Sequence, residues 1–438
     1  MNILIDSCSY NCQNAGDLAM LMVAVSRLRE LWPAANINVI TNAPHLMARH
    51  CGAVDTVPVR GRRLLLEDRL LGRFHRQLPH RLTQTWSTLE QELRLRQPGL
   101  FKTSIGLKAA LFGRDARDVC TFLDAIGQAD LVVVNGAGII ADAFRDHALG
   151  ILTTLELANR RGVPTALFGQ GLGPIEDGEL RRRASKTLGG ASLIGVRESL
   201  TGPQLLSSLG VDPKHVVVTG DDAIELAYAE YGRSHGSQGG EAIGVNVRIA
   251  PYAEVRPDLL PLLRSVLQCA GQQHGARLVP IPIAHHGGGM DVSALHDLLE
   301  GIGESDGGAA LQTPRDVIRR VGICRIVVTG SYHGAVFALS QGIPAVALVK
   351  SRYYLHKMAG VAHEFGTGCH MVNLDEDDLS TRLSEAISRA WAEADGVREP
   401  LLQSAADQIR RGKAAYRRLR DLVSCGSATS PAELSYNV

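Results

Sequence analysis

Residues 327–348, VVTGSYHGAVFALSQGIPAVAL, decide the fold of this chain. The β-branched run at their start predicts a buried strand, GSYHG at 330–334 predicts a turn, and the apolar run after it predicts a helix followed by a second strand. This succession indicates a parallel sheet with a crossover helix, and such sheets bind ligands beyond the carboxyl ends of their strands. We therefore expect His333 at a helix N-terminus that faces a ligand cleft.

The same alternation of strand, glycine-containing turn and helix extends along most of the 438 residues. It predicts an α/β fold with two doubly wound, Rossmann-like domains that face a cleft. The stretch 231–241, YGRSHGSQGGE, has no periodicity and is the best linker candidate. We expect domains over 1–232 and 241–375, with helices and a tail over 376–438. The expected strands are 2–6, 36–41, 130–135, 164–169, 192–196, 215–219, 243–247, 277–281, 325–329 and 344–348.

The segment from about 60 to 118 interrupts this alternation and predicts a basic helical insert. It contains 13 Lys/Arg against 6 Asp/Glu and no clear strand. Within 60–81, leucines and Phe74 alternate with arginines, a pattern typical of helices that lie on anionic membranes. An ordinary amphipathic helix packed on its own domain has the same pattern. The 60–81 region is therefore a candidate for peripheral membrane contact.

The bulk composition excludes several classes of protein. The net charge of +1 argues against a nucleic-acid binder, and the eight scattered cysteines form no CxxC pair and complete no zinc-ligand spacing. The N-terminus lacks the pattern of a signal peptide, and no apolar run reaches the ~20 residues that span a bilayer. We expect a cytoplasmic enzyme that uses no metal.

Candidate ligand contacts lie in the loops that follow the expected strands. Glycines there allow a ligand to approach the backbone closely. An arginine at a strand end either pairs with an acidic neighbour or binds a carboxylate or phosphate. Asn14 and the acids at 221–222 have a simpler alternative, because such residues often only cap helices. The loops are 12–17, 135–138, 169–174, 196–199, 220–223, 247–248 and 330–334.

The order and spacing of several fragments resemble the polysaccharide pyruvyl transferase family. The fragments are NAGDLAM, NGAG, FGQGLGP, GVRES, TGDDA, VNVR and TGSYHGAVFALSQGIPAVAL, followed by KSRYY and Lys357, and they run from about Asn14 to Lys357. The resemblance implies a fold similar to the GT-B glycosyltransferases. It also implies transfer of the pyruvyl group of phosphoenolpyruvate to two sugar hydroxyls, which forms a cyclic ketal and releases phosphate. No cofactor is implied beyond phosphoenolpyruvate as co-substrate.

The resemblance carries roles onto particular residues. Arg197 and His333 match positions that matter in the family, and Arg248 matches an arginine that commonly ends the first strand of the second domain. His333 is the expected acid, and Asp17 or Asp142 the expected base, on the acceptor side. The acceptor is expected to be a polysaccharide or a lipid-linked saccharide precursor. Expected substrate contacts are Asn14, Gly16, Gly136, Gly138, Gln170, Gly171, Arg197, Asp221, Arg248, Ser331, Tyr332, Gly334, Lys350 and Lys357.

One position departs from the family pattern. Many members have arginine two residues before the motif histidine, where this chain has Ser331. Arg248, Lys350, Arg352 or Lys357 could supply the missing cation, or the donor could differ.

Two other functions fit the same fold. A GT-B glycosyltransferase would bind a nucleotide sugar, but the acids of the second domain, such as Asp291 and Glu300, form no clear ribose-binding motif. A non-catalytic family member would explain Ser331, whereas the joint presence of Arg197, Arg248 and His333 argues against it.

Overall fold

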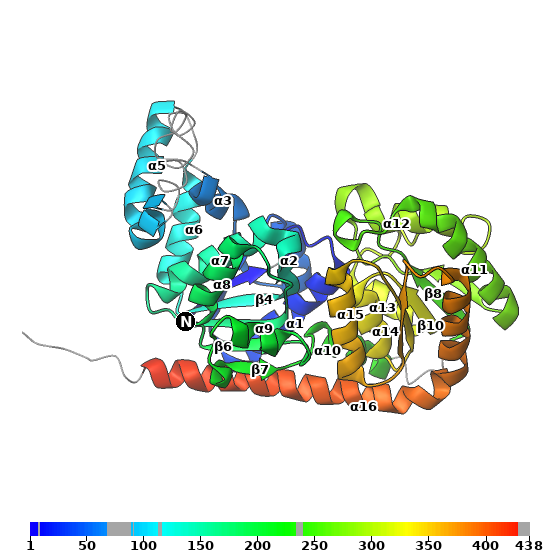
Figure 1. The fold of residues 1–438 in the computed structure, drawn as a ribbon. Helices are drawn as coiled ribbons and strands as arrows, with labels where there is room; N and C mark the ends of the chain where they lie inside the picture. The colour runs from blue at the N-terminus through cyan, green and yellow to red at the C-terminus, as the bar shows by residue number, and fades with distance from the viewer. Residues whose placement is uncertain (8, 68–88, 91, 113–115, 234–239, 428–438) are drawn as a thin grey trace, which may run out of the picture.

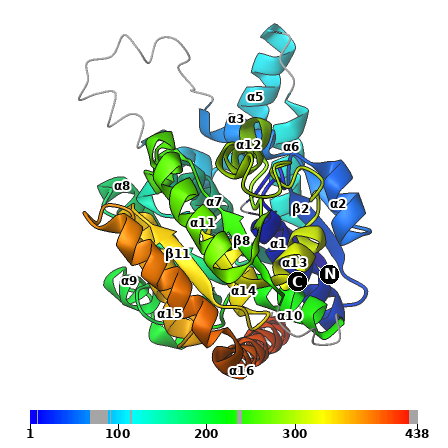
Figure 2. The same cartoon turned by 90° about the vertical axis from the view of Figure 1, so that its right-hand side faces the viewer.

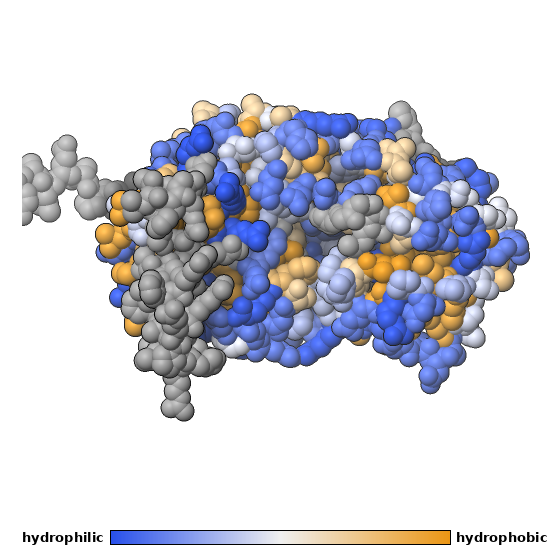
Figure 3. Space-filling model, turned by 90° about the horizontal axis from the view of Figure 1, so that it is seen from above, coloured by the Kyte–Doolittle hydropathy of each residue, from blue (hydrophilic) through white to orange (hydrophobic). Residues whose placement is uncertain are grey.

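Two parallel β-sheets with helices on both faces make up the protein (Figure 1). The structure is a computed structural model that describes residues 1–7, 9–67, 89–90, 92–112, 116–233 and 240–427. Seen from above, the described surface is mostly hydrophilic, with scattered hydrophobic patches (Figure 3).

The first unit is built on a seven-stranded sheet of order β3-β2-β1-β4-β5-β6-β7. Side chains alternate between its faces: Leu4 packs toward the helices α6 to α8, whereas Ile3 and Ile5 pack toward α1 and α16. The elements are β1 (Asn2–Ser7), α1 (Ala15–Leu31), β2 (Asn36–Ile40), α2 (Pro44–Cys51), β3 (Asp55–Val57), α3 (Val59–Glu67), α5 (Pro98–Phe112), α6 (Arg117–Gln128), β4 (Leu131–Ile140), α7 (Arg145–Asn159), β5 (Thr165–Leu172), α8 (Gly178–Leu188), β6 (Leu193–Val196), α9 (Gly202–Ser208), β7 (Val216–Val218) and α10 (Ala223–Arg233).

The second unit is built on a five-stranded sheet of order β12-β11-β10-β8-β9. Figure 2 looks at this unit end-on, with the first unit behind it. Its strands are buried nearly throughout, as expected for a parallel sheet covered on both faces. The elements are β8 (Ala242–Asn246), α11 (Leu260–His274), β9 (Arg277–Pro280), α12 (His286–Leu299), α13 (Pro314–Gly322), β10 (Cys324–Thr329), α14 (Tyr332–Leu339), β11 (Ala345–Val349), α15 (Arg352–Phe365), β12 (Cys369–Asn373) and α16 (Leu379–Ser427).

Helix α16 connects the two units along one side of the molecule (Figure 1). It is a single helix of 49 residues with Pro400 inside it, where the sequence suggested several helices. Its first half packs on the second sheet, and its second half returns to the first. There Tyr416 stacks on Phe168 with ring centroids 3.8 Å apart, and its hydroxyl donates a hydrogen bond to Asp222, which also pairs with Arg27.

Two strands escaped the sequence analysis, and two others are longer than expected. β3 and β12 are short edge strands with polar residues, so they lack the apolar run that marks a central strand. β4 continues through the NGAG segment to Ile140, because a register shift with positive φ at Gly136 and Ala137 bends the strand without ending it. β5 likewise continues through Gln170 and Gly171 to Leu172.

The insert is helical where the structure describes it. α3, the helical residues 89–90 and 92–96, α5 and the start of α6 lie in the described parts of 60–118. Residues 68–81 of the membrane-type pattern at 60–81, and residues 234–239 of the proposed linker at 231–241, lie outside the described residues. Within the described ranges, no helix is long and apolar enough to cross a membrane.

Tyr416→Phe should weaken the attachment of α16 to the first unit. The change keeps the ring stacked on Phe168 but removes a hydrogen bond to a buried carboxylate, so we expect the free energy of unfolding to fall by about 1.5 kcal/mol in urea denaturation. Ser384→Ala, an exposed change on the same helix, is the control and should move it by less than about 0.5 kcal/mol. Equal effects of the two changes would contradict this role for Tyr416.

Candidate active site

A cavity of about 460 Å³ opens between the two units at the carboxyl ends of their strands. Residues after β1, β2 and β4 form one wall, and residues after β8, β10 and β11 form the other. The position is the one that doubly wound sheets use for ligands. The residues that line it are Ser9, Tyr10, Asn11, Asn14, Asp17, Asn42, Ala137, Gly138, Ile139, Phe144, His147, Arg248, Tyr252, Ser331, Tyr332, His333, Tyr353, Tyr354 and Lys357.

His333 lies where the two units meet. It stands in the first turn of α14, with Nδ1 3.9 Å from Asp17 Oδ1 and Nε2 3.7 Å from Asp221 Oδ2. Nε2 is buried and has no hydrogen-bond partner among the described residues. Gly16 of α1 packs directly on the ring, since a Cβ there would lie 1.9 Å from His333 Cγ. The imidazole is thus held between two carboxylates with one nitrogen unsatisfied.

Asp221 and Arg197 form a buried charged layer behind the cavity wall. Burial alone would raise the pKa of Asp221, but the His333 imidazole and the Arg197 guanidinium outweigh it and hold that pKa below its ordinary value. Arg197 Cζ lies 3.8 Å from the ring centroid of Tyr332, and a side chain at Gly171 would collide with the guanidinium. Arg197 therefore supports Tyr332 from behind and does not line the cavity.

Arg248 lines the cavity, but its charge is compensated. Nε and Nη2 donate to the two carboxylate oxygens of Asp291 at 2.8 and 2.9 Å, and Nη1 donates to Tyr252 Oη at 3.0 Å. Burial opposes the charge of Arg248, but Asp291 prevails and the pKa lies well above its ordinary value. Nη2 also reaches Ser331 Oγ at 3.4 Å. A serine at 331 therefore lies beside a guanidinium supplied by another strand.

Lys357 is the least compensated cation of the cavity. Nζ donates to Tyr353 Oη at 2.8 Å and lies over three tyrosine rings, and it forms no ion pair with any described carboxylate. Burial first, then the charges of Arg197 and Arg248, hold the pKa of Lys357 well below its ordinary value, while Asp17 and Asp221 act in the opposite direction. An anion in the cavity would stabilise the ammonium form.

Several residues expected at the site lie elsewhere. Asp142, one expected base, accepts hydrogen bonds from the backbone amides of Glu176 and Asp177 and does not line the cavity. Lys350 pairs with Asp375 away from it, and Arg352 pairs with Glu176. Four other expected contacts support the walls from behind, namely Gly136 against Met20, Gln170 beside Val134 and Phe168, Gly171 against Arg197, and Gly334 against Thr329.

The sequence analysis missed most of the aromatic lining. Tyr10, Phe144, Tyr252, Tyr353 and Tyr354 all face the cavity, together with His147. Tyr10 and the pair at 353–354 follow β1 and β11, so their strand-end positions were a usable signal. Phe144 and Tyr252 belong to different units, and their rings meet at 5.1 Å because the two units face each other.

Comparisons with known proteins agree with this arrangement. The model of the family described as polysaccharide pyruvyl transferase matches residues 14–351, well over half of the chain. No curated protein sequence matches this chain. The chain is similar in fold to Anabaena HepE in complex with UDP (14% identity, 98% of this chain and 100% of that one, TM-score 0.51). It is also similar to a putative UDP-N-acetylglucosamine 2-epimerase from Listeria monocytogenes (13%, 98% and 97%, TM-score 0.54). These likenesses confirm a GT-B-like fold.

Gly16→Ala should displace the His333 imidazole. The new methyl group has no room beside the ring, so we expect the His333 side-chain signals to shift in NMR spectra and the protein to lose about 1–3 kcal/mol of stability. Gly178→Ala, at a helix start with nothing within 4 Å of the new Cβ, is the control and should leave the His333 signals in place. Unchanged His333 signals in Gly16→Ala would show that the contact is not as described.

Proposed function

Because this chain belongs to the polysaccharide pyruvyl transferase family, we propose that it transfers a pyruvyl group from phosphoenolpyruvate to a saccharide and forms a cyclic ketal. The observation that carries the proposal is the cavity in which Lys357, lying with Arg248 and His333, forms no ion pair with a carboxylate of the described residues. Phosphoenolpyruvate carries a carboxylate and a phosphate, and both need cations and hydrogen-bond donors. Lys357 would hold one of these groups, and Arg248 with Ser331 would hold the other.

The proposed reaction forms two carbon–oxygen bonds to the sugar and breaks the one to the phosphate oxygen. The two hydroxyl protons of the sugar are released in the process. The methylene carbon of phosphoenolpyruvate takes a proton from His333, and the central carbon becomes an oxocarbenium-like centre. The first sugar hydroxyl attacks this carbon, and its proton passes to a base. The bond to the phosphate oxygen then breaks with its electron pair, the second hydroxyl forms the second carbon–oxygen bond, and its proton leaves with phosphate. One hydroxyl proton thus replaces that of His333, and the other ends on phosphate.

Asp17 is the better candidate for the base on the acceptor side. It lines the cavity and lies 3.9 Å from His333 Nδ1, whereas Asp142 is occupied with backbone amides outside the cavity.

The structure gives less support to a nucleotide-sugar donor. Asp291, the acid considered for a ribose contact, is fully buried and accepts hydrogen bonds from Arg248 and from the backbone amides of Ile283 and Ala284. Glu300 does not line the cavity. Neither acid is placed to meet a ribose in this cavity.

The insert supports a lipid-linked acceptor at a membrane surface. Leu93, Leu100 and Leu107 are exposed on its helices, Leu100 to 60% and Leu107 to 62%. The same helices carry Arg96 and Lys102, which pair with Glu92 and Asp124. Exposed leucines beside basic residues suit peripheral contact with anionic lipids.

Lys357→Met should weaken phosphoenolpyruvate binding about 10- to 100-fold in calorimetric titration. The change removes the least compensated cation while keeping an apolar stem, and a hydrogen bond to a charged group contributes about 1.5–3 kcal/mol. Lys350→Met is the matched control, because Lys350 lies outside the cavity and pairs with Asp375. No binding of phosphoenolpyruvate, with saturable binding of UDP-N-acetylglucosamine instead, would replace the proposal by the glycosyltransferase alternative.

Phosphoenolpyruvate binding should take up protons at pH values between the depressed pKa of Lys357 in the free protein and its higher pKa in the complex. The pKa of Lys357 is depressed in the free protein and would rise in the complex, so the affinity gained from its charge is present at lower pH and lost as pH rises through the pKa of the complex. Phosphate monoesters titrate near pH 6, so the ligand itself contributes little above pH 7. The binding heat should therefore depend on the ionisation enthalpy of the buffer, and this dependence should vanish in Lys357→Met. A heat independent of the buffer in the unmodified protein would contradict the role of Lys357.

A further inference from the structure

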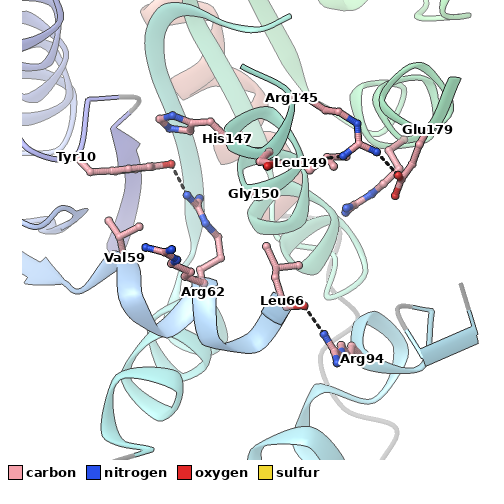
Figure 4. A pocket seen from close by; sticks show the side chains of 13 residues that line it. Tyr10, Val59, Arg62, Leu66, Arg94, Arg145, His147, Leu149, Gly150 and Glu179 are labelled. Carbon is pink, nitrogen blue, oxygen red and sulfur yellow. Dashed lines mark hydrogen bonds and ion pairs between the residues drawn. The ribbon is translucent and has the colours of Figure 1, made fainter. Parts of the chain in front are cut away.

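A second cavity, of about 740 Å³, lies between the insert and the first sheet (Figure 4). Helix α3 supplies one wall, and α7 and α8 supply the other. Its volume falls in the range of about 300–1,000 Å³ that is usual for ligand pockets. The residues that line it are Tyr10, Val59, Arg62, Arg63, Leu66, Arg94, Arg145, Asp146, His147, Leu149, Gly150, Glu179 and Arg183. We call it the arginine cavity.

The described residues that line this cavity include five arginines and two carboxylates. The acids that pair with the deepest arginines are buried and do not line it, as with Asp6 behind Arg62 and Glu156 behind Arg183. Arg145 lies nearer the surface, between Asp177 and Glu179. The planar guanidinium group forms paired hydrogen bonds with carboxylates and phosphates, and it also suits the hydroxyls of a sugar.

Two aromatic residues connect the arginine cavity to the reaction cavity. Tyr10 and His147 line both, and their rings stack with centroids 4.6 Å apart. Tyr10 Oη donates to Asp6 at 3.0 Å and receives a hydrogen bond from Arg62. His147 Nε2 is buried and has no hydrogen-bond partner within the described part of the chain. A buried polar atom of this kind, placed between two cavities, points to a ligand.

We propose that the arginine cavity binds the acceptor as a saccharide that carries an anionic group, and that Tyr10 and His147 position its hydroxyls at the entrance to the reaction cavity. The proposal rests on the proposed function and specifies its acceptor, which must be acidic, either as a phosphate ester or as a sugar carboxylate. The arginines would hold the anion, and His147 Nε2 would hold a sugar hydroxyl at the entrance to the reaction cavity, which Lys357 also lines. Burial, together with Arg62, lowers the pKa of His147 to about 4, which keeps the ring neutral at physiological pH and able to accept a hydrogen bond from a hydroxyl.

Arg145→Gln tests the anion site, with Arg160→Gln as the matched control. Both arginines belong to α7 or its C-terminal end and both are ion-paired near the surface, but only Arg145 lines the cavity. We would titrate glucose 1-phosphate, glucuronic acid and glucose into each protein and follow binding by calorimetry. We expect an anionic sugar to bind, glucose to bind far more weakly, and Arg145→Gln to lower the affinity of the anionic sugar about tenfold while Arg160→Gln leaves it unchanged.

The outcomes distinguish a phosphate ester from a sugar carboxylate, and they also include results that would overturn the proposal. Preference for glucose 1-phosphate identifies a phosphate ester, and preference for glucuronic acid identifies a sugar carboxylate. Equal affinity for glucose, equal losses in the two variants, or no binding of either acid would overturn the proposal. His147→Phe, which keeps the stack on Tyr10, should weaken binding of the anionic sugar about fivefold.

Phosphoenolpyruvate titrations on the same samples keep the two proposals distinguishable. Binding of an acidic sugar that depends on Arg145, without binding of phosphoenolpyruvate, would retain the arginine cavity and refute the donor. Binding of phosphoenolpyruvate that depends on Lys357, without binding of an acidic sugar, would retain the donor and refute the arginine cavity.

Discussion

The contact between Gly16 and His333 fixes the distance between the two units. The first turn of α1 lies against the imidazole of α14, and beside it the Ala15 amide donates to the Ile283 carbonyl and the His285 amide donates to the Gln13 carbonyl. Any larger residue at position 16 would push the strand ends apart. The cavity, the placement of Asp17 next to His333 and the meeting of the aromatic rings all depend on this close approach.

Arg248 and Lys357, which both line the cavity, differ in how their charge is compensated. Arg248 is neutralised by Asp291 before any ligand arrives, so it mainly offers directed hydrogen bonds. Among the described residues, Lys357 contacts a hydroxyl and tyrosine rings but pairs with no carboxylate, and burial makes its ammonium form costly until an anion is present. A neutral ligand would leave that cost unrelieved. Ser331 lies beside the Arg248 guanidinium, in a cavity that Lys357 also lines.

The sequence predicted the architecture well because buried parallel strands have apolar runs that loops lack. It also identified Asn14, Asp17, Gly138, His333 and Lys357 as candidate ligand contacts, and all five line one cavity, because strand ends converge in such folds. It could not separate Lys350 from Lys357, because α15 starts between them and directs only the second lysine inward. Nor could it show that Arg197 and Gln170 lie one layer behind the wall, because depth depends on how neighbouring side chains pack.

Helix α16 makes the first unit dependent on the end of the chain. All seven strands of its sheet are complete by Val218, yet Tyr416 and Leu419 belong to the core that covers one face of that sheet. During synthesis, the ribosome must add about two hundred more residues before this face is covered. The sheet of the first unit is therefore synthesised long before the helix that covers one of its faces. This exposed apolar face must be kept from aggregation throughout translation of the second half.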